Sequence, residues 1–132
     1  MKHFKHNDGG RKAAGFFNTN DSCVRAMAIA CQISYVKARK ICKEASAFGE
    51  MQSRAIAKGV YKQDFEGALR SLGWKYVKIP RVKGESSKVA DLPEGRYIAE
   101  MTNQFVAVID NVANDTADCS HRVIKGYWRP SK

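Results

Sequence analysis

Residues 20–31 have the sequence NDSCVRAMAIAC, and this stretch carries the clearest structural signal of the chain. Its first three residues, Asn20, Asp21 and Ser22, are all good helix N-caps. From residue 24 onward the stretch is apolar on nearly every side, and only Arg25 interrupts it. A helix that is apolar all round is buried inside a protein. The stretch therefore predicts a buried helix with Cys23 in its first turn.

The segments on either side differ in character. Residues 1–20 are rich in Gly, Asn, Lys and His, so we expect an N-terminal arm or irregular lead-in, with Phe16 and Phe17 docking on the core. Ser34 can cap a second helix that runs through about residue 48. A polar loop over residues 50–59 and a third helix over residues 61–72 follow.

After residue 73 the hydrophobic period changes from the helical value to 2, which is typical of strands. Because the links between the strands are too short for helical crossovers, we expect antiparallel pairing. Helices first and strands later is an α+β pattern, so residues 21–132 are predicted to form one domain in which N-terminal helices pack on an antiparallel sheet. The expected strands are residues 74–79, 97–101, 104–110 and 123–128, with a long loop over residues 80–95.

Composition limits the class of protein. A chain of 132 residues with 44% hydrophobic and 27% charged residues is expected to be one globular domain. Its longest apolar run, residues 26–31, is six residues long, against roughly 20 for a membrane helix. No apolar segment follows the basic start, so we expect no secretory leader. The prediction is a cytoplasmic protein with reduced cysteines, no metal and no cofactor.

The net charge of +10 favours anionic partners. Residues 37–62 hold seven basic and two acidic residues, so half of the net charge lies there. Four of the basic residues fall in the second predicted helix and form a candidate anion-binding set for an acidic protein or a nucleic acid. The alternative is a solvated helix face, and no nucleic-acid motif accompanies the set. The four are Lys37, Arg39, Lys40 and Lys43.

A series of short motifs spans residues 11–128 in a fixed order. This series resembles a family of small papain-like cysteine-peptidase-type proteins found in phage and bacterial genomes. The resemblance implies a papain-like fold and a phage protein that acts on a host component in the bacterial cytoplasm. The motifs are RKAAGF at 11–16, DSCVRAMAIA at 21–30, GVYK at 59–62, LGW at 72–74, LPEGR at 92–96, AVID at 107–110, DTADCS at 115–120 and GYW at 126–128.

The resemblance also implies three site residues. The family's nucleophile matches Cys23, the residue that orients its base matches Asp115, and the base itself, a histidine, is replaced by Gln104. The family's glycine after Ile-Asp is replaced by Asn111. Because a glutamine amide neither accepts nor returns a proton at neutral pH, general-base catalysis is lost. We therefore expect a pseudoenzyme that binds a partner through the groove that corresponds to the family's active site.

Other candidates for the chemistry stay open at this stage. An active hydrolase would need Cys23, Asp115 and a non-standard base such as His121. From its own segment, Cys23 is equally compatible with a small buried hydrophobe at a helix start. The pair His3 and His6 has a spacing that only weakly suggests metal, and solvated arm residues are the simpler interpretation.

Overall fold

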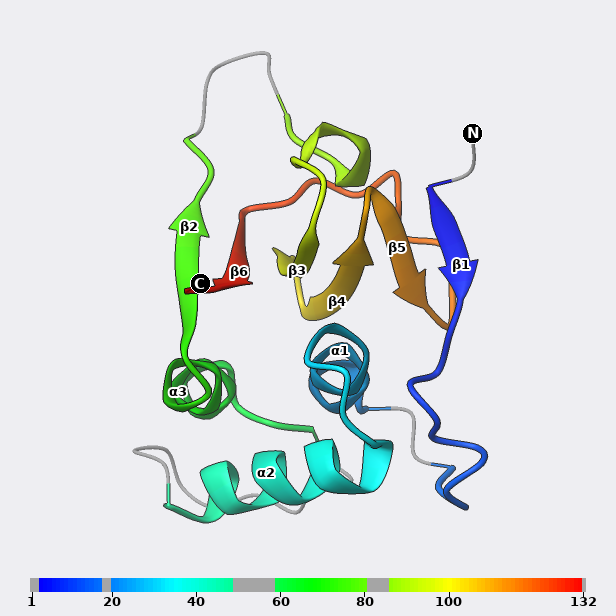
Figure 1. Ribbon diagram of the computed structural model, residues 1–132, viewed down its shortest axis with the longest axis vertical. Helices are drawn as coiled ribbons and strands as arrows, with labels where there is room; N and C mark the ends of the chain where they lie inside the picture. The colour runs from blue at the N-terminus through cyan, green and yellow to red at the C-terminus, as the bar shows by residue number, and fades with distance from the viewer. Residues whose placement is uncertain (1–2, 18–19, 49–58, 81–85, 132) are drawn as a thin grey trace.

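The computed structural model describes residues 3–17, 20–48, 59–80 and 86–131, in which three helices lie on one side of a six-stranded mixed sheet (Figure 1). The predicted α+β class is confirmed at this level. The helix α1 (Ser22–Ala30) packs directly on the sheet, α2 (Tyr35–Phe48) packs on α1, and α3 (Lys62–Ser71) lies beside the strand β2 (Trp74–Lys78).

The three helices form where the sequence predicts them. The hydroxyl of Ser34 accepts a hydrogen bond from the backbone N–H of Lys37 (3.1 Å), so Ser34 caps α2 as expected. In α1, Met27 and Ala30 are fully buried between the sheet and α2, which explains why this helix is apolar all round. The predicted loop over residues 50–59 lies outside the described residues except for its last position.

The sheet has the strand order β1-β5-β4-β3-β6-β2. Its remaining strands are β1 (Phe4–His6), β3 (Arg96–Met101), β4 (Gln104–Ile109), β5 (Val112–Asp115) and β6 (Gly126–Pro130). All neighbouring pairs are antiparallel except β1 and β5, which are parallel. The expectation of a wholly antiparallel sheet is therefore wrong at the β1 edge.

The N-terminal segment is not a free arm over its described residues. The strand β1 pairs with β5 so that His6 lies opposite Asp115, and the backbone N–H of Asn7 donates to the carbonyl oxygen of Asp115 (2.9 Å). Phe16 packs against Tyr35 with 5.4 Å between ring centroids, as expected, whereas Phe17 is 81% exposed. The sequence does not predict β1 because it has three residues, of which Lys5 and His6 are polar, and so carries little strand signal.

The turn between β4 and β5 explains one departure from the family motif. Asp110 and Asn111 both adopt positive φ values, 46° and 66°, as the two central residues of a tight hairpin turn require. Asparagine tolerates this left-handed conformation, and the Asn111 side chain also donates to the carbonyl oxygen of Leu92 (2.5 Å). Asn111 can therefore stand where the family has glycine. The sequence does not predict β5, because only four residues follow the turn and two of them, Asn114 and Asp115, are polar.

The far face of the sheet has a second, smaller core. The 3-10 helix η2 (Val89–Asp91) interrupts the predicted long loop, and Val89 is fully buried. Val108 and Ile124 pack in the same cluster. The strand β6 begins at Gly126, later than predicted, while the preceding residue, Lys125, donates its backbone N–H to the carbonyl oxygen of Glu100 (2.8 Å). Burial on both faces fixes the hairpin β3–β4 at the centre of the sheet.

Candidate functional site

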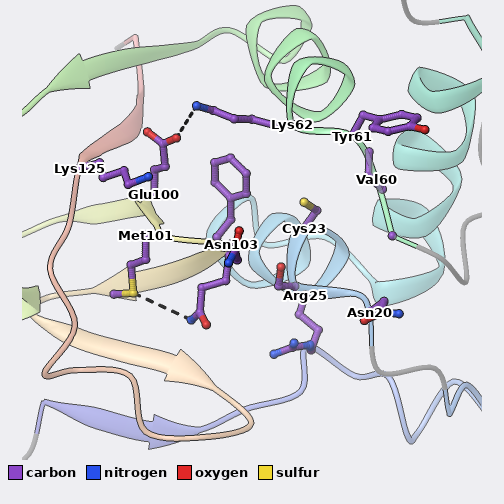
Figure 2. Close-up of a pocket in the computed structure, with 14 residues that line it drawn as sticks. Asn20, Cys23, Arg25, Val60, Tyr61, Lys62, Glu100, Met101, Asn103 and Lys125 are labelled. Carbon is purple, nitrogen blue, oxygen red and sulfur yellow. Dashed lines mark hydrogen bonds and ion pairs between the residues drawn. The ribbon is translucent and has the colours of Figure 1, made fainter. Parts of the chain in front are cut away.

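A cleft of about 620 Å³ lies where the start of α1 meets the β3–β4 hairpin (Figure 2). Its described lining comes from within residues 20–25, 59–62 and 100–105, together with Lys125. Cys23 and Gln104 both line this cleft. Two residues that the sequence places in one site are thus brought to the same cavity from different elements.

Cys23 is the second residue of α1 and is only 8% exposed. Burial raises the pKa of its thiol to about 12, although a hydrogen bond from Ser22 and the positive charge of Arg25 act in the opposite direction. The free-energy cost of removing a thiolate from water here is larger than the stabilisation that the helix N-terminus provides. Cys23 is therefore a neutral thiol near pH 7 and a poor nucleophile.

Gln104 and Asp115 are held together by a hydrogen bond. The amide nitrogen Nε2 of Gln104 donates to Oδ2 of Asp115 (3.3 Å), and the guanidinium of Arg122 donates to the amide oxygen of Gln104 (2.5 Å). Arg122 also donates to the carbonyl oxygen of Thr102 (2.7 Å). Both polar ends of the Gln104 side chain therefore have partners, and the amide is fixed in one orientation.

Asp115 has several further donors. Arg25 forms an ion pair with its Oδ1, the backbone N–H of Thr116 donates to the same oxygen (2.7 Å), and the thiol of Cys119 donates to Oδ2 (3.6 Å). A buried carboxylate with this many donors is held in a fixed position. Asp115 therefore holds the side chain of residue 104 in place, and the orienting role that the family resemblance implies stays a prediction.

Arg25 connects the start of α1 to this carboxylate, and sequence reasoning did not assign it a role. Its Nε donates to Oδ1 of Asp21 (2.8 Å), while its guanidinium also pairs with Asp115. Asp21 accepts in addition from Arg11 (2.9 Å) and from the hydroxyl of Tyr35 (2.9 Å). Asp21 therefore makes no side-chain cap for α1. The sequence feature that points to this role is a lone arginine in an apolar helix. Such an arginine is expected to have an acidic partner, because buried arginines are almost always paired.

A second ion pair, which the sequence analysis does not predict, lies in the cleft wall. Figure 2 shows Lys62 reaching from the start of α3 to Glu100 of β3, with 2.6 Å between Nζ and Oε2. The hydroxyl of Tyr76 donates to the other carboxylate oxygen (2.7 Å). Burial alone would raise the pKa of Glu100, but the hydrogen bonds from Lys62 and Tyr76 outweigh it and lower that pKa. Glu100 is therefore charged and neutralised by Lys62.

The histidines do not supply a base to the cleft. His121 is exposed on the loop before β6 and is not among the described residues that line the cleft. In the N-terminal segment, Nδ1 of His3 donates to the carbonyl oxygen of Asn111 (2.9 Å), and His6 is exposed on the edge strand β1. Among the described residues no group of three or more His, Cys, Asp or Glu side chains could hold a metal ion.

The four candidate anion-binding residues divide into two groups. Lys37, Lys40 and Lys43 are exposed on α2. The guanidinium carbon of Arg39 instead lies 4.5 Å from the centre of the Phe16 ring, and its Nε is buried without a hydrogen-bond partner among the described side chains. Arg39 therefore holds the N-terminal segment against α2, and the three lysines are the ones available to an anion.

Comparisons with known proteins give no match: no family model, no curated protein and no solved structure matches the chain. Within the described part of the chain, no helix has both the length and the apolar character that a bilayer crossing needs.

The arrangement as a whole is suited to binding. A single acidic residue, Glu100, faces three basic ones in the described lining, namely Arg25, Lys62 and Lys125. The thiol is protonated, the residue beside Asp115 is an amide, and the described lining residues include no histidine. A cleft of this size can hold several residues of a polypeptide.

Proposed function

We propose that this protein is a degenerate papain-like cysteine-peptidase-type domain that binds a partner protein in its cleft and does not hydrolyse it. The observation that carries the proposal is the hydrogen bond from Gln104 to Asp115 beside the cleft that Cys23 also lines. A cysteine at the start of a helix, facing a hairpin that holds the two partner positions, supports a papain-like arrangement.

The absence of catalysis follows from two features of the site. A thiol with a pKa raised to about 12 is almost wholly protonated at neutral pH. An amide at position 104 cannot deprotonate it, and positioned acid–base catalysis is worth about 10² to 10⁴ in rate. Arg122 and Asp115 hold the amide in place, so the site is organised around glutamine.

The partner that the cleft favours is an acidic segment of a host protein in the bacterial cytoplasm. Lys62 is paired with Glu100 and Arg25 with two carboxylates. The exposed Lys125 forms no ion pair with the described residues, so it gives the cleft an excess of positive charge that orients an acidic chain. The exposed basic residues of the rest of the protein add to the attraction. The phage origin and the cytoplasmic location in this proposal come from the family resemblance.

The test places a photo-crosslinking amino acid at Asn103, an exposed residue in the cleft, and at Asp118, an exposed residue that does not line it. In bacterial cells, we expect a discrete crosslinked adduct from position 103, and the same adduct when Cys23 is replaced in Cys23→Ala. Position 118 should give only a weak adduct. Equal adducts from both positions would overturn binding in the cleft. Turnover of a thioester or peptide substrate that disappears in Cys23→Ala would establish the working hydrolase instead.

A further inference from the structure

A second, smaller groove of about 250 Å³ lies at the other end of α1. It is bounded by Cys31 and Ile33 in the link from α1 to α2, by Leu72 at the end of α3, and by Trp74 of β2. It shares no described lining residue with the cleft that holds Cys23. What binds here is therefore independent of the function proposed for that cleft.

The groove exposes more apolar surface than a solvated turn needs. Leu72 is 43% exposed, and the partly exposed Ile33, Ile41 and Pro130 line the groove with it. Leu72 is fixed in place because its backbone N–H bonds to the carbonyl oxygens of Ala68 and Leu69 (both 3.1 Å). Clustered, rigid apolar surface of this kind marks interaction sites.

The charge around the groove has one sign. Lys37 and Arg96 are the charged residues in its described lining, and both are basic. Nε of Arg96 is buried without a hydrogen-bond partner in the described chain, and no ion pair of the described residues involves Arg96 or Lys37. An unpaired guanidinium beside an apolar surface is complementary to a carboxylate attached to an apolar group.

The size of the groove points to a side chain as the occupant. Small-molecule pockets are typically about 300–1,000 Å³, and this groove is smaller. A single bulky side chain that enters such a pocket, with polar groups at the rim, is the usual anchor of a peptide or protein partner. A membrane surface would instead need apolar groups that project outward with many basic residues around them.

We propose that this groove binds an acidic, apolar segment of a partner protein, with one bulky apolar side chain between Leu72 and Trp74 and a neighbouring carboxylate paired with Arg96 and Lys37. The apolar side chain supplies the affinity, and the carboxylate fixes the orientation of the segment. The groove is thus a second protein-binding surface, at the opposite end of α1 from the cleft.

The test uses a displayed library of random octapeptides, selected on the full-length protein and counter-selected on Leu72→Glu. We expect the enriched peptides to carry Asp or Glu within two positions of Leu, Ile, Phe or Trp. A synthetic peptide of the enriched sequence should shift the NMR signals of Ile33, Leu72 and the Trp74 indole. Its affinity should fall at least tenfold in Lys37→Gln/Arg96→Gln and stay unchanged in Lys75→Gln, an exposed lysine of β2 outside the groove.

The outcomes that overturn the proposal are distinct. Three results would show that the groove does not bind acidic, apolar peptides. They are enriched peptides without acidic residues, no enrichment at all, and peptide-induced NMR shifts confined to the cleft. Binding of vesicles containing phosphatidylglycerol that is lost in Leu72→Glu would assign the groove to a membrane surface. A dimer in sedimentation equilibrium that dissociates in Leu72→Glu would assign it to a second copy of the chain.

Discussion

The side-chain amide of Gln104 donates to the carboxylate of Asp115 across 3.3 Å, so the first residue of β4 is bonded to the last residue of β5. Its amide oxygen accepts from Arg122 at the same time. A glutamine with both polar ends bonded is held in one orientation, which supports the proposal of a binding cleft without a general base at position 104.

Gln104→His is expected to raise the rate of Cys23 alkylation at pH 7 about tenfold. An imidazolium held by Asp115 beside the thiol would stabilise the thiolate, and one unit of pKa is a factor of ten in thiolate concentration. The measurement is iodoacetamide labelling of Cys23, resolved from the other three cysteines by mass spectrometry.

The matched control for this substitution is Gln104→Asn, which introduces no base and should leave the labelling rate unchanged. An unchanged rate in Gln104→His, with a folded protein by circular dichroism, would mean that position 104 does not face the sulfur. The family alignment on which the role of Gln104 rests would then be wrong.

The native protein should label slowly at Cys23 throughout the range from pH 7 to pH 9. The thiol pKa is raised to about 12 by burial, whereas the thiol of the unfolded chain ionises near ~8.5. The folded state thus favours the protonated thiol, so this contribution to stability is complete below the unfolded pKa and declines as the pH rises toward 12. Labelling of native protein that reaches half its maximal rate below pH 8 would contradict a buried, inert cysteine.

Arg25→Ala should lower the free energy of unfolding by about 3–5 kcal/mol, because it leaves the buried carboxylate of Asp115 without its ion-pair partner, while Asp21 keeps its ion pair with Arg11. Arg25→Lys should recover only part of this, since one ammonium cannot bridge both carboxylates as the guanidinium does. Urea denaturation measures both variants. If the loss of stability in Arg25→Ala arises from uncompensated charge, the double variant Arg25→Ala/Asp115→Asn should be more stable than Arg25→Ala. If the loss is purely steric, the two variants should be equally stable.

The local parts of the structure were predictable because each depends on neighbours in the sequence. The apolar run after Cys23 predicted α1, and the spacing of apolar residues predicted α2 and α3. The family resemblance named Gln104 and Asp115 as site positions, and the structure places them in hydrogen-bond contact.

The parts that were missed depend on contacts between distant segments. The pairing of β1 with β5 joins the start of the chain to residue 115, and no local pattern records such a register. The same holds for the bridge from Arg25 to Asp115 and for the pair of Lys62 with Glu100. A charged residue in an apolar segment indicates that it has a partner of opposite charge. The identity of that partner depends on the fold.

Gly126→Ala should lower the free energy of unfolding by about 1–3 kcal/mol, which is the usual cost of overpacking. A Cβ at Gly126 of β6 would collide with the ring and hydroxyl of Tyr76, and displacing that ring breaks its hydrogen bond to Glu100 in the cleft wall. Gly67→Ala in α3 is the matched control, because its Cβ meets no atom within 4 Å. Alanine there should stabilise the helix by up to about 1 kcal/mol, so thermal melts should show shifts of opposite sign.

Lys40→Gln/Lys43→Gln should lower the salt concentration at which the protein elutes from heparin. Both lysines are exposed on α2. For a nucleic acid, each lost phosphate contact makes the slope of log affinity against log salt concentration less steep by about 0.7–0.9. Arg39→Gln is the informative comparison, since Arg39 stacks on Phe16 and should lower the melting temperature with little effect on elution. Equal elution of the wild type and the double lysine variant would show that α2 presents a solvated face, and the anion-binding assignment of these lysines would then be wrong.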